Sequence, residues 1–283
     1  MLTSLSSAVS GLDAYQEQMD IIGNNIANLN TTGFKSATGN LADSFSNTLQ
    51  AATVTTGSLN ATNAMQIGTG VNTASITNDW SQGTVNSTGV TSDLAINGNG
   101  FFVVQNPTTG AQYATQDGTF TVNANGNLVT STGMLVQGYS NSGLSTLGSI
   151  QINTTGMPAT SSPTATMTSY TINAQGVITV NLSDGTSFSR GQVLLQNFTD
   201  PQALTSVGNN LYSNMAGAGA LSSLTAPGST GLGTIQSGAL ELSNVDLSAQ
   251  MANLITAQRA FEANSKIITT SDELLQDVVN MKR

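Results

Sequence analysis

Cysteine and histidine are both absent from the 283 residues of this chain. Their absence excludes disulfide bonds, thiol nucleophiles, imidazole acid–base chemistry and metal sites built from His or Cys. Charge is also scarce, because only 7% of residues are charged, against the usual quarter or so. Arg190 is the only basic residue between positions 36 and 258, and the net charge is −9. The chain therefore lacks the basic stripe that binding to nucleic acid or to an anionic membrane surface requires.

Long apolar runs are missing too, since none approaches the roughly 20 residues of a transmembrane helix. The N-terminus has neither a basic n-region nor a continuous apolar h-region, so we expect no cleaved signal peptide. Residues 98–101 lack the third glycine of a dinucleotide fingerprint, and residues 123–127 lack the carboxylates of a calcium loop. We expect no enzyme activity, no cofactor, no metal and no small-molecule substrate. A paired-carboxylate glycosidase site stays open in principle, although no spacing supports it.

The C-terminal segment, from about residue 243 to 283, has the heptad pattern of a helix that packs lengthwise on another helix. One row is apolar at every seventh position and comprises Leu247, Leu254, Phe261, Ile268 and Leu275. A second, interleaved row is apolar only at its ends and comprises Met251, Gln258, Ser265, Asp272 and Val279. Its polar middle is either a solvent-facing edge or, as we prefer, a set of polar layers that fix the register against a partner helix. Ser243 or Asn244 is the expected N-cap.

The N-terminal segment, residues 3–29, is the candidate partner helix. Its apolar heptad row comprises Leu5, Leu12, Met19 and Ile26, and a weaker row comprises Leu2, Val9, Gln16 and Gly23. The turn signal at residues 30–33 ends this helix. The two terminal segments have two interpretations. The simpler one is a pair of ordinary amphipathic helices on one globular core, and the more specific one is a terminal coiled coil used for assembly.

Between the helices the pattern changes twice. Residues 36–70 show little periodicity, which indicates an extended or weakly structured connector with a short helix at about 40–50 or, alternatively, a disordered linker. From residue 71 to about 235, short apolar strands alternate with glycine turns. Residues 97–100, 123–126 and 174–176 each predict a hairpin turn, and residues 184–185 a further one.

These patterns predict an α+β, multi-domain fold in which long terminal helices form a coiled-coil-like core and a mainly antiparallel β domain is inserted between them. Four segments are expected: an N-terminal core helix (1–30), an extended connector (31–70), a central β domain (71–235) and a C-terminal core helix (236–283).

Several motifs of the chain resemble motifs of one protein family, and they follow one another in the same order as in that family. Residues 23–35, GNNIANLNTTGFK, resemble the signature of bacterial flagellar axial proteins, and residues 7–12 fit its start. Residues 98–104 and 117–120 resemble the β domain of that family, and residues 237–247 with 258–261 resemble its closing helix. The match covers both ends and most of the middle of the chain.

The resemblance implies a hook or rod subunit of the flagellum that stacks helically into a hollow tube, with its terminal helices inside and its β domain outside. It further implies unfolded export through the flagellar secretion channel and contact with neighbouring axial proteins, the hook cap and the export apparatus. The closing segment and residues 135–139 favour the hook, whereas the short overall length and the long connector favour the distal rod. We favour the hook. A secreted adhesin or glycan-processing β domain is a remote rival.

The residues expected at the assembly interface lie on the two helices and in the motif that follows the first. They are Leu5, Val9, Leu12, Met19, Ile26, Asn28, Thr31, Gly33, Phe34, Lys35, Leu247, Met251, Leu254, Gln258, Phe261, Ser265, Ile268, Leu275 and Val279.

Overall fold

A computed structural model describes residues 2–52, 63–158, 161–162, 164–220, 224–229 and 231–281. The chain forms two compact units. The helical unit comprises Met1–Ala27, Ser36–Asp79 and Val245–Arg283, and the β unit comprises Asn28–Lys35 and Trp80–Asn244. Residues 36–79 thus group with the helices and residues 28–35 with the strands, whereas the sequence places boundaries at residues 30, 70 and 235. None of the described helices has the length and apolarity to cross a membrane.

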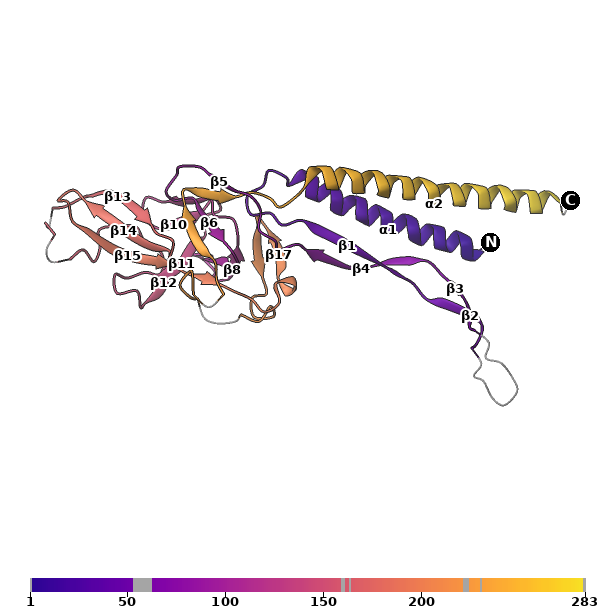
Figure 1. Ribbon diagram of the computed structural model, residues 1–283, viewed down its shortest axis with the longest axis horizontal. Helices are drawn as coiled ribbons and strands as arrows, with labels where there is room; N and C mark the ends of the chain where they lie inside the picture. Colours follow the sequence, from indigo (N-terminus) through magenta and orange to yellow (C-terminus); the bar gives the residue numbers. More distant parts are fainter. Residues whose placement is uncertain are drawn as a thin grey trace. The chain divides into compact units, whose positions relative to one another are not determined.

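The helical unit is built on two helices, α1 (Leu2–Ala27) and α2 (Leu247–Met281). They lie side by side and antiparallel, and the C-terminal part of α2 extends past the N-terminus of α1 (Figure 1). The Asp246 carboxylate accepts hydrogen bonds from the amides of Ser248 and Ala249 at 2.8 and 3.3 Å, so Asp246 caps α2. The prediction of Ser243 or Asn244 as the cap was therefore wrong by two or three residues. Two helices are confirmed at the predicted ends of the chain.

A β ribbon completes the helical unit. β1 (Ala37–Asp43) pairs with β4 (Val71–Asn78), and β2 (Ser46–Gln50) pairs with β3 (Met65–Gly68), both antiparallel. The predicted short helix at about 40–50 is wrong, because β1 and β2 occupy those positions. The period of two is hard to recognise there because the side chains are mostly small and polar. Residues 53–62 of the predicted connector lie outside the described residues.

The β unit contains the remaining strands, which are short. They are β5 (Val85–Ser87), β6 (Leu94–Asn97), β7 (Phe101–Gln105), β8 (Gln112–Thr115), β9 (Phe120–Val122), β10 (Leu128–Thr130), β11 (Leu135–Tyr139), β12 (Leu147–Ser149), β13 (Met167–Ile172), β14 (Val177–Leu182), β15 (Ser187–Val193), β16 (Leu195–Gln196), β17 (Thr205–Gly208), β18 (Leu211–Ser213), β19 (Thr234–Ser237) and β20 (Ala239–Glu241). A single 3₁₀ turn, Pro201–Ala203, is also found in the described part of this unit. The predicted α+β class is confirmed.

Most of these strands form one antiparallel sheet, which has 12 strands within the described residues. Its main path runs β13-β14-β15-β11-β7-β8-β18-β17, and two further ladders join β19 to β6 and β20 to β5. The two ends of the unit's main segment therefore meet: strands from residues 85–97 pair with strands from residues 234–241.

Three of the predicted hairpins are confirmed, since β9 pairs with β10, β13 with β14 and β14 with β15. The hairpin predicted around residues 97–100 is wrong. β6 pairs with β19, and β7 pairs with β8, β11 and β16. The glycine turn instead carries the chain from one ladder into another, because both flanking strands are buried and find distant partners.

Two clusters of buried side chains hold the β unit together. The larger one is centred on Phe102 and Phe120, whose rings meet edge to face with centroids 5.1 Å apart. The smaller one contains Phe101, Phe198 and Tyr212, with Trp80 packed against it. Burial of these rings, together with the leucine, isoleucine and valine side chains of the larger cluster, stabilises the unit.

Candidate assembly surface

The contact between α1 and α2 is made through small and polar side chains. At Gly11, an added Cβ would lie 2.5 Å from Nδ2 of Asn264, so a larger residue there would require the Asn264 side chain to move. The buried side chains of the pair include Ala8 and Ala14 on α1 and Ala257 on α2. Small residues let helix backbones come close together, and they bury little apolar area in doing so. The pair therefore keeps most of its large apolar side chains for other contacts.

The inner row of α2 differs from the interleaved row expected from the sequence. Gln250, Ala257, Asn264 and Ser271 of α2 recur at every seventh position and are all buried or partly exposed. Gln250 accepts from Asn25 of α1, and Asn264 lies beside Gly11 of α1. The expected polar layers at Gln258, Ser265 and Asp272 are one position further on, and all three are exposed. The apolar row was placed correctly in part, since Leu254, Phe261 and Ile268 are only partly exposed. The heptad pattern of large apolar residues could not identify this row, because none of its four members is large and apolar.

Asn25 ties three elements of the helical unit together. Its side chain is fully buried, donates to the carbonyl of Ala37 at 2.8 Å and accepts from the amide of Ala37 at 2.9 Å. It also donates to Oε1 of Gln250 at 3.4 Å. The end of α1, the start of β1 and the start of α2 are thus fixed to one another. The sequence motif contains Asn25, but its periodicity gave no reason to single it out.

α2 carries exposed large apolar residues on several sides of the helix, and five of them lie in its last eight residues. Its exposed large apolar residues are Leu247, Met251, Ile255, Ile267, Leu274, Leu275, Val278, Val279 and Met281. Large apolar residues scattered singly are normal, but a series along one helix marks an interaction surface. Two of the five positions of the predicted interleaved row, Met251 and Val279, belong to this surface.

The outer part of the β ribbon is exposed in the same way. Every residue of β2 and β3 is exposed, and Phe45 beside them has 87% of its surface accessible. Leu49, Met65 and Ile67 are also exposed apolar residues. A two-stranded ribbon is at best marginally stable in water. β1 and β4 gain support from α1, where Oγ of Ser10 accepts from the amide of Val71, whereas β2 and β3 have no packed side chains of their own.

The motif segment Asn28–Lys35 is anchored inside the β unit. Oγ1 of Thr32 donates to Oδ1 of Asp117 at 2.9 Å, and Nδ2 of Asn210 donates to the carbonyl of Thr32 at 2.6 Å. Gly33 has φ of +65°, and a Cβ there would lie 2.7 Å from the amide nitrogen of Asp117. Only glycine therefore fits this turn against the loop between β8 and β9.

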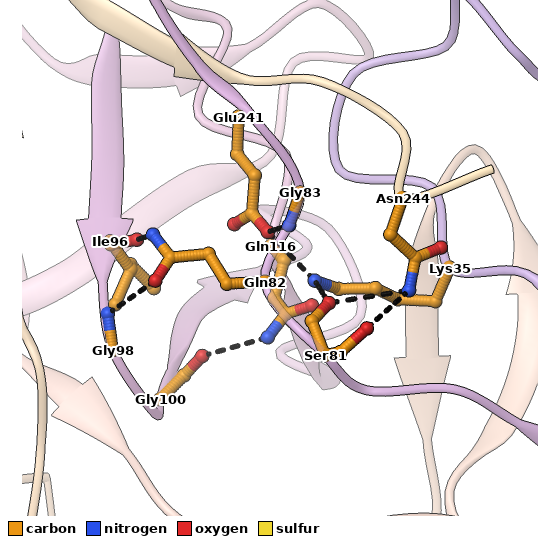
Figure 2. Close-up of polar contacts among 10 residues, drawn as sticks. All are labelled: Lys35, Ser81, Gln82, Gly83, Ile96, Gly98, Gly100, Gln116, Glu241 and Asn244. Carbon is orange, nitrogen blue, oxygen red and sulfur yellow. Dashed lines mark hydrogen bonds and ion pairs between the residues drawn. The ribbon is translucent and has the colours of Figure 1, made fainter. Parts of the chain in front are cut away.

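Lys35 and Glu241 form a buried ion pair between two segments of the β unit (Figure 2). Nζ of Lys35 lies 2.7 Å from Oε1 of Glu241, and the side chains are only 2% and 4% exposed. Nζ also donates to the carbonyl of Ser81 at 2.8 Å, and Oε1 accepts from the amide of Gly83 at 2.8 Å. Asn244 donates to the same carbonyl of Ser81 at 3.3 Å. A buried pair with its hydrogen bonds satisfied fixes the geometry of the segments that carry it.

The predicted interface residues fall into three groups. Those partly exposed on the helices are Leu5, Leu12, Met19, Ile26, Leu254, Phe261 and Ile268. Those exposed on the helices are Val9, Leu247, Met251, Gln258, Ser265, Leu275 and Val279. Those in the β unit are Asn28, Thr31 and Phe34, which are partly exposed, and Gly33 and Lys35, which are buried.

Three protein-family models match the chain in the order of its motifs. The family described as "Flagella basal body rod protein" matches residues 5–35, "Flagellar hook protein FlgE/F/G D1 domain" matches residues 95–180, and "Flagellar basal body rod FlgEFG protein C-terminal" matches residues 236–281. The chain therefore belongs to the flagellar hook and rod protein family, whose members are structural axial proteins of the flagellum and not enzymes.

The similar proteins include both rod proteins and hook proteins, and the matches to the two differ in length. The flagellar basal-body rod protein FlgG of Bacillus subtilis strain 168 is 38% identical over 283 residues, which is 100% of both chains. FlgG of Buchnera aphidicola subsp. Baizongia pistaciae is 37% identical over 278 residues, 98% of both chains. The flagellar hook protein FlgE of Helicobacter mustelae is 46% identical over 140 residues, which is 49% of this chain and 31% of that protein. The rod alternative therefore fits better than the hook that the sequence motifs favoured.

Proposed function

We propose that this chain is a distal rod subunit, which polymerises helically into a stiff hollow shaft that transmits torque in the flagellum. The observation that carries the proposal is the match to rod proteins over their whole length. That match includes residues 37–50 and 65–78, which contain the four strands of the β ribbon in this chain. The hook is the second candidate, supported by the higher identity to a hook protein over about half of the chain.

The exposed apolar face of α2 supports polymerisation. An exposed series of large apolar residues is costly in water, and burial against other copies would remove about 25 cal/mol per Å² of that cost. We assign this surface, the exposed residues of β2 and β3, and the partly exposed helix rows to contacts between copies. A coiled-coil-like core would then form from helices of several copies. Gly33 and Lys35 would act indirectly, because they are buried and hold the motif segment in place.

The Asn25 junction supports a stiff shaft. It joins α1, β1 and α2 through hydrogen bonds to a fully buried side chain, so that these three elements would move together. A hook subunit has to slide against its neighbours as the hook bends, whereas a drive shaft requires fixed elements. Neighbouring axial proteins, the hook cap and the export apparatus are the expected further partners, with export in the unfolded state.

Truncation tests the polymerisation surface. Removing residues 246–283 deletes α2, and we expect sedimentation of the concentrated or seeded protein to detect no polymer. Emission from Trp80 should still show a cooperative unfolding transition, because the residue belongs to the β unit. A truncated chain that polymerised like the full chain would exclude α2 as the assembly surface.

Location along the axis tests rod against hook. A small tag inserted after Gly143, in a described loop of the β unit, would be localised by cryo-EM of native hook–basal bodies. We expect the tag along the straight distal part of the rod. Tag density along the curved hook would overturn the rod assignment and restore the hook.

A further inference from the structure

Two basic side chains of α2, Arg259 and Lys266, lie on the side of that helix that faces away from α1. The side toward α1 carries Asn264, which lies beside α1, and the buried Ala257 one heptad earlier. At about 100° per residue, the two bases lie roughly 200° around α2 from these residues, and both are exposed. Within the described residues, Lys266 forms no ion pair, and Arg259 pairs only with Glu262 of the same helix, at 2.8 Å. These bases are therefore available to a partner other than α1 of the same chain.

The charged residues of α1 are all acidic, and they form one exposed stripe. Asp13, Glu17 and Asp20, here called the acidic stripe, follow one another at steps of four and three residues, and all three are exposed. α1 contains no lysine or arginine, so these like charges repel one another without compensation on the helix. Asp13 and Asp20 lie roughly 180–200° around α1 from Gly11, the residue beside Asn264 of α2. The acidic stripe therefore also faces away from the other helix of its own chain.

A hollow of about 250 Å³ lies between α1 and β4, beside the acidic stripe. Its lining holds two carboxylates and no basic residue, and comprises Ser10, Asp13, Ala14, Glu17, Val71, Asn72 and Thr73. A lysine suits such a hollow, because its ammonium is compact, has three donors and sits on a flexible apolar stem. Lys266 is the only exposed lysine among the described residues, since Lys35 is buried against Glu241.

The spacing of the bases matches that of the acids. Asp13 and Asp20 are seven residues apart, and so are Arg259 and Lys266. When two copies lie side by side in the same direction, α1 of one copy runs antiparallel to α2 of the next. A single register then joins Asp13 to Lys266 and Asp20 to Arg259 at the same time. Arg259 can keep Glu262 as well, because a guanidinium has five N–H donors.

We propose that the acidic stripe of one copy receives Lys266 and Arg259 from α2 of a second copy, with Lys266 in the hollow beside Asp13 and Arg259 at Asp20. This inference rests on the proposed polymer and specifies how its copies align. The contact joins two different surfaces, so each copy offers both and the contact can repeat along a helical assembly. Exposed ion pairs contribute little each, so these pairs select the register while apolar burial supplies most of the stability.

Charge reversal in the full-length chain tests this contact. Lys266→Glu adds a carboxylate opposite the acidic stripe, and Asp13→Lys adds an ammonium opposite Lys266. We expect each variant alone to raise the critical concentration about tenfold in sedimentation assays, because like charges then meet between copies. An equal mixture of the two variants should assemble nearly as wild type. In alternating copies, each reversed acid meets a reversed base, and each native acid meets a native base. Both positions are exposed, so urea unfolding and helical circular dichroism of the monomers should match wild type.

The matched control mixes Lys266→Glu with Asp20→Lys, which places the same charges on the same helices in the wrong register. This mixture should assemble as poorly as the single variants. Rescue by the control mixture instead of the first mixture would mean that the helices meet in parallel, and it would overturn the proposed register.

Two further results would refute the contact while leaving the polymer intact. One is wild-type critical concentrations for all three variants, and the other is weakened assembly that neither mixture rescues. A wild type that forms no polymer would refute the proposed function and this inference together.

Discussion

The β unit and the helical unit bury different kinds of side chain. The β unit encloses aromatic rings such as Phe102 and Phe120, both essentially inaccessible. The helix pair buries mainly small residues and one amide, such as Ala8, Ala257 and Asn25, while many of the large apolar side chains of α2 are exposed. Apolar burial is the dominant stabilising contribution to folding. We therefore expect the β unit to fold as a single chain and the helical unit to depend on other copies for much of its burial.

Substitution of Lys35 tests the β unit most severely. Lys35→Met leaves Glu241 buried without its cation, and we expect a loss of about 3–5 kcal/mol in the free energy of unfolding. Urea unfolding followed at Trp80 measures this loss. Lys266→Met, at an exposed position on α2, should change nothing. Adding Glu241→Gln to Lys35→Met should recover part of the loss, because the unpaired charge is removed. A single Lys35→Met variant as stable as wild type would mean that the pair does not hold these segments.

Substitution of Asn25 tests the one tightly hydrogen-bonded junction of the helical unit. Asn25→Ala removes two hydrogen bonds to the backbone of Ala37, and we expect the local stability to fall by about 1–3 kcal/mol. Thermal loss of helical circular dichroism should occur at lower temperature, while Trp80 emission should report an unchanged β unit. Asn253→Ala, at an exposed position of α2, is the control. Equal helix melting in the two variants would show that the junction contributes nothing.

Substitution of Ile255 on the outer face of α2 should have the smallest effect on the monomer. Ile255→Ser removes an exposed side chain, so the free energy of unfolding should stay within about 0.5 kcal/mol of wild type. Assembly should nevertheless weaken, with a higher critical concentration in sedimentation assays. Asn253→Ser, a polar change at an exposed position of the same helix, should leave assembly as it is. If both variants assembled alike, α2 would not use its apolar face between copies.

Much of the fold follows from local sequence patterns. Heptad rows located both helices, and glycine turns located three hairpins. The pairing of β6 with β19 could not be predicted, because both strands are only four residues long and nothing local specifies a partner about 140 residues away. The ribbon was missed because β1 and β2 are rich in small polar residues, which have no clear period.

Only part of the candidate assembly surface could be predicted, because only its large apolar residues produce a recognisable sequence pattern. Large apolar residues such as Leu254 and Phe261 revealed the packed side of α2 approximately. The closest contacts involve Gly11 and Asn264, which carry no hydrophobic signal. The Lys35–Glu241 pair joins residues separated by 206 positions, so no local spacing could indicate it. Asn25 lies in the family motif, yet its role depends on a backbone strand that only the folded structure brings to it.

Amide hydrogen exchange tests the contrast between the two units most directly. In dilute monomer, amides of the β unit around Phe102 should be strongly protected, while those of α2 from residue 265 to 281 should exchange nearly freely. In the polymer, both sets should be protected, with the large gain confined to the helical unit. Protection of α2 in the monomer equal to that of the β unit would contradict the dependence of the helical unit on other copies.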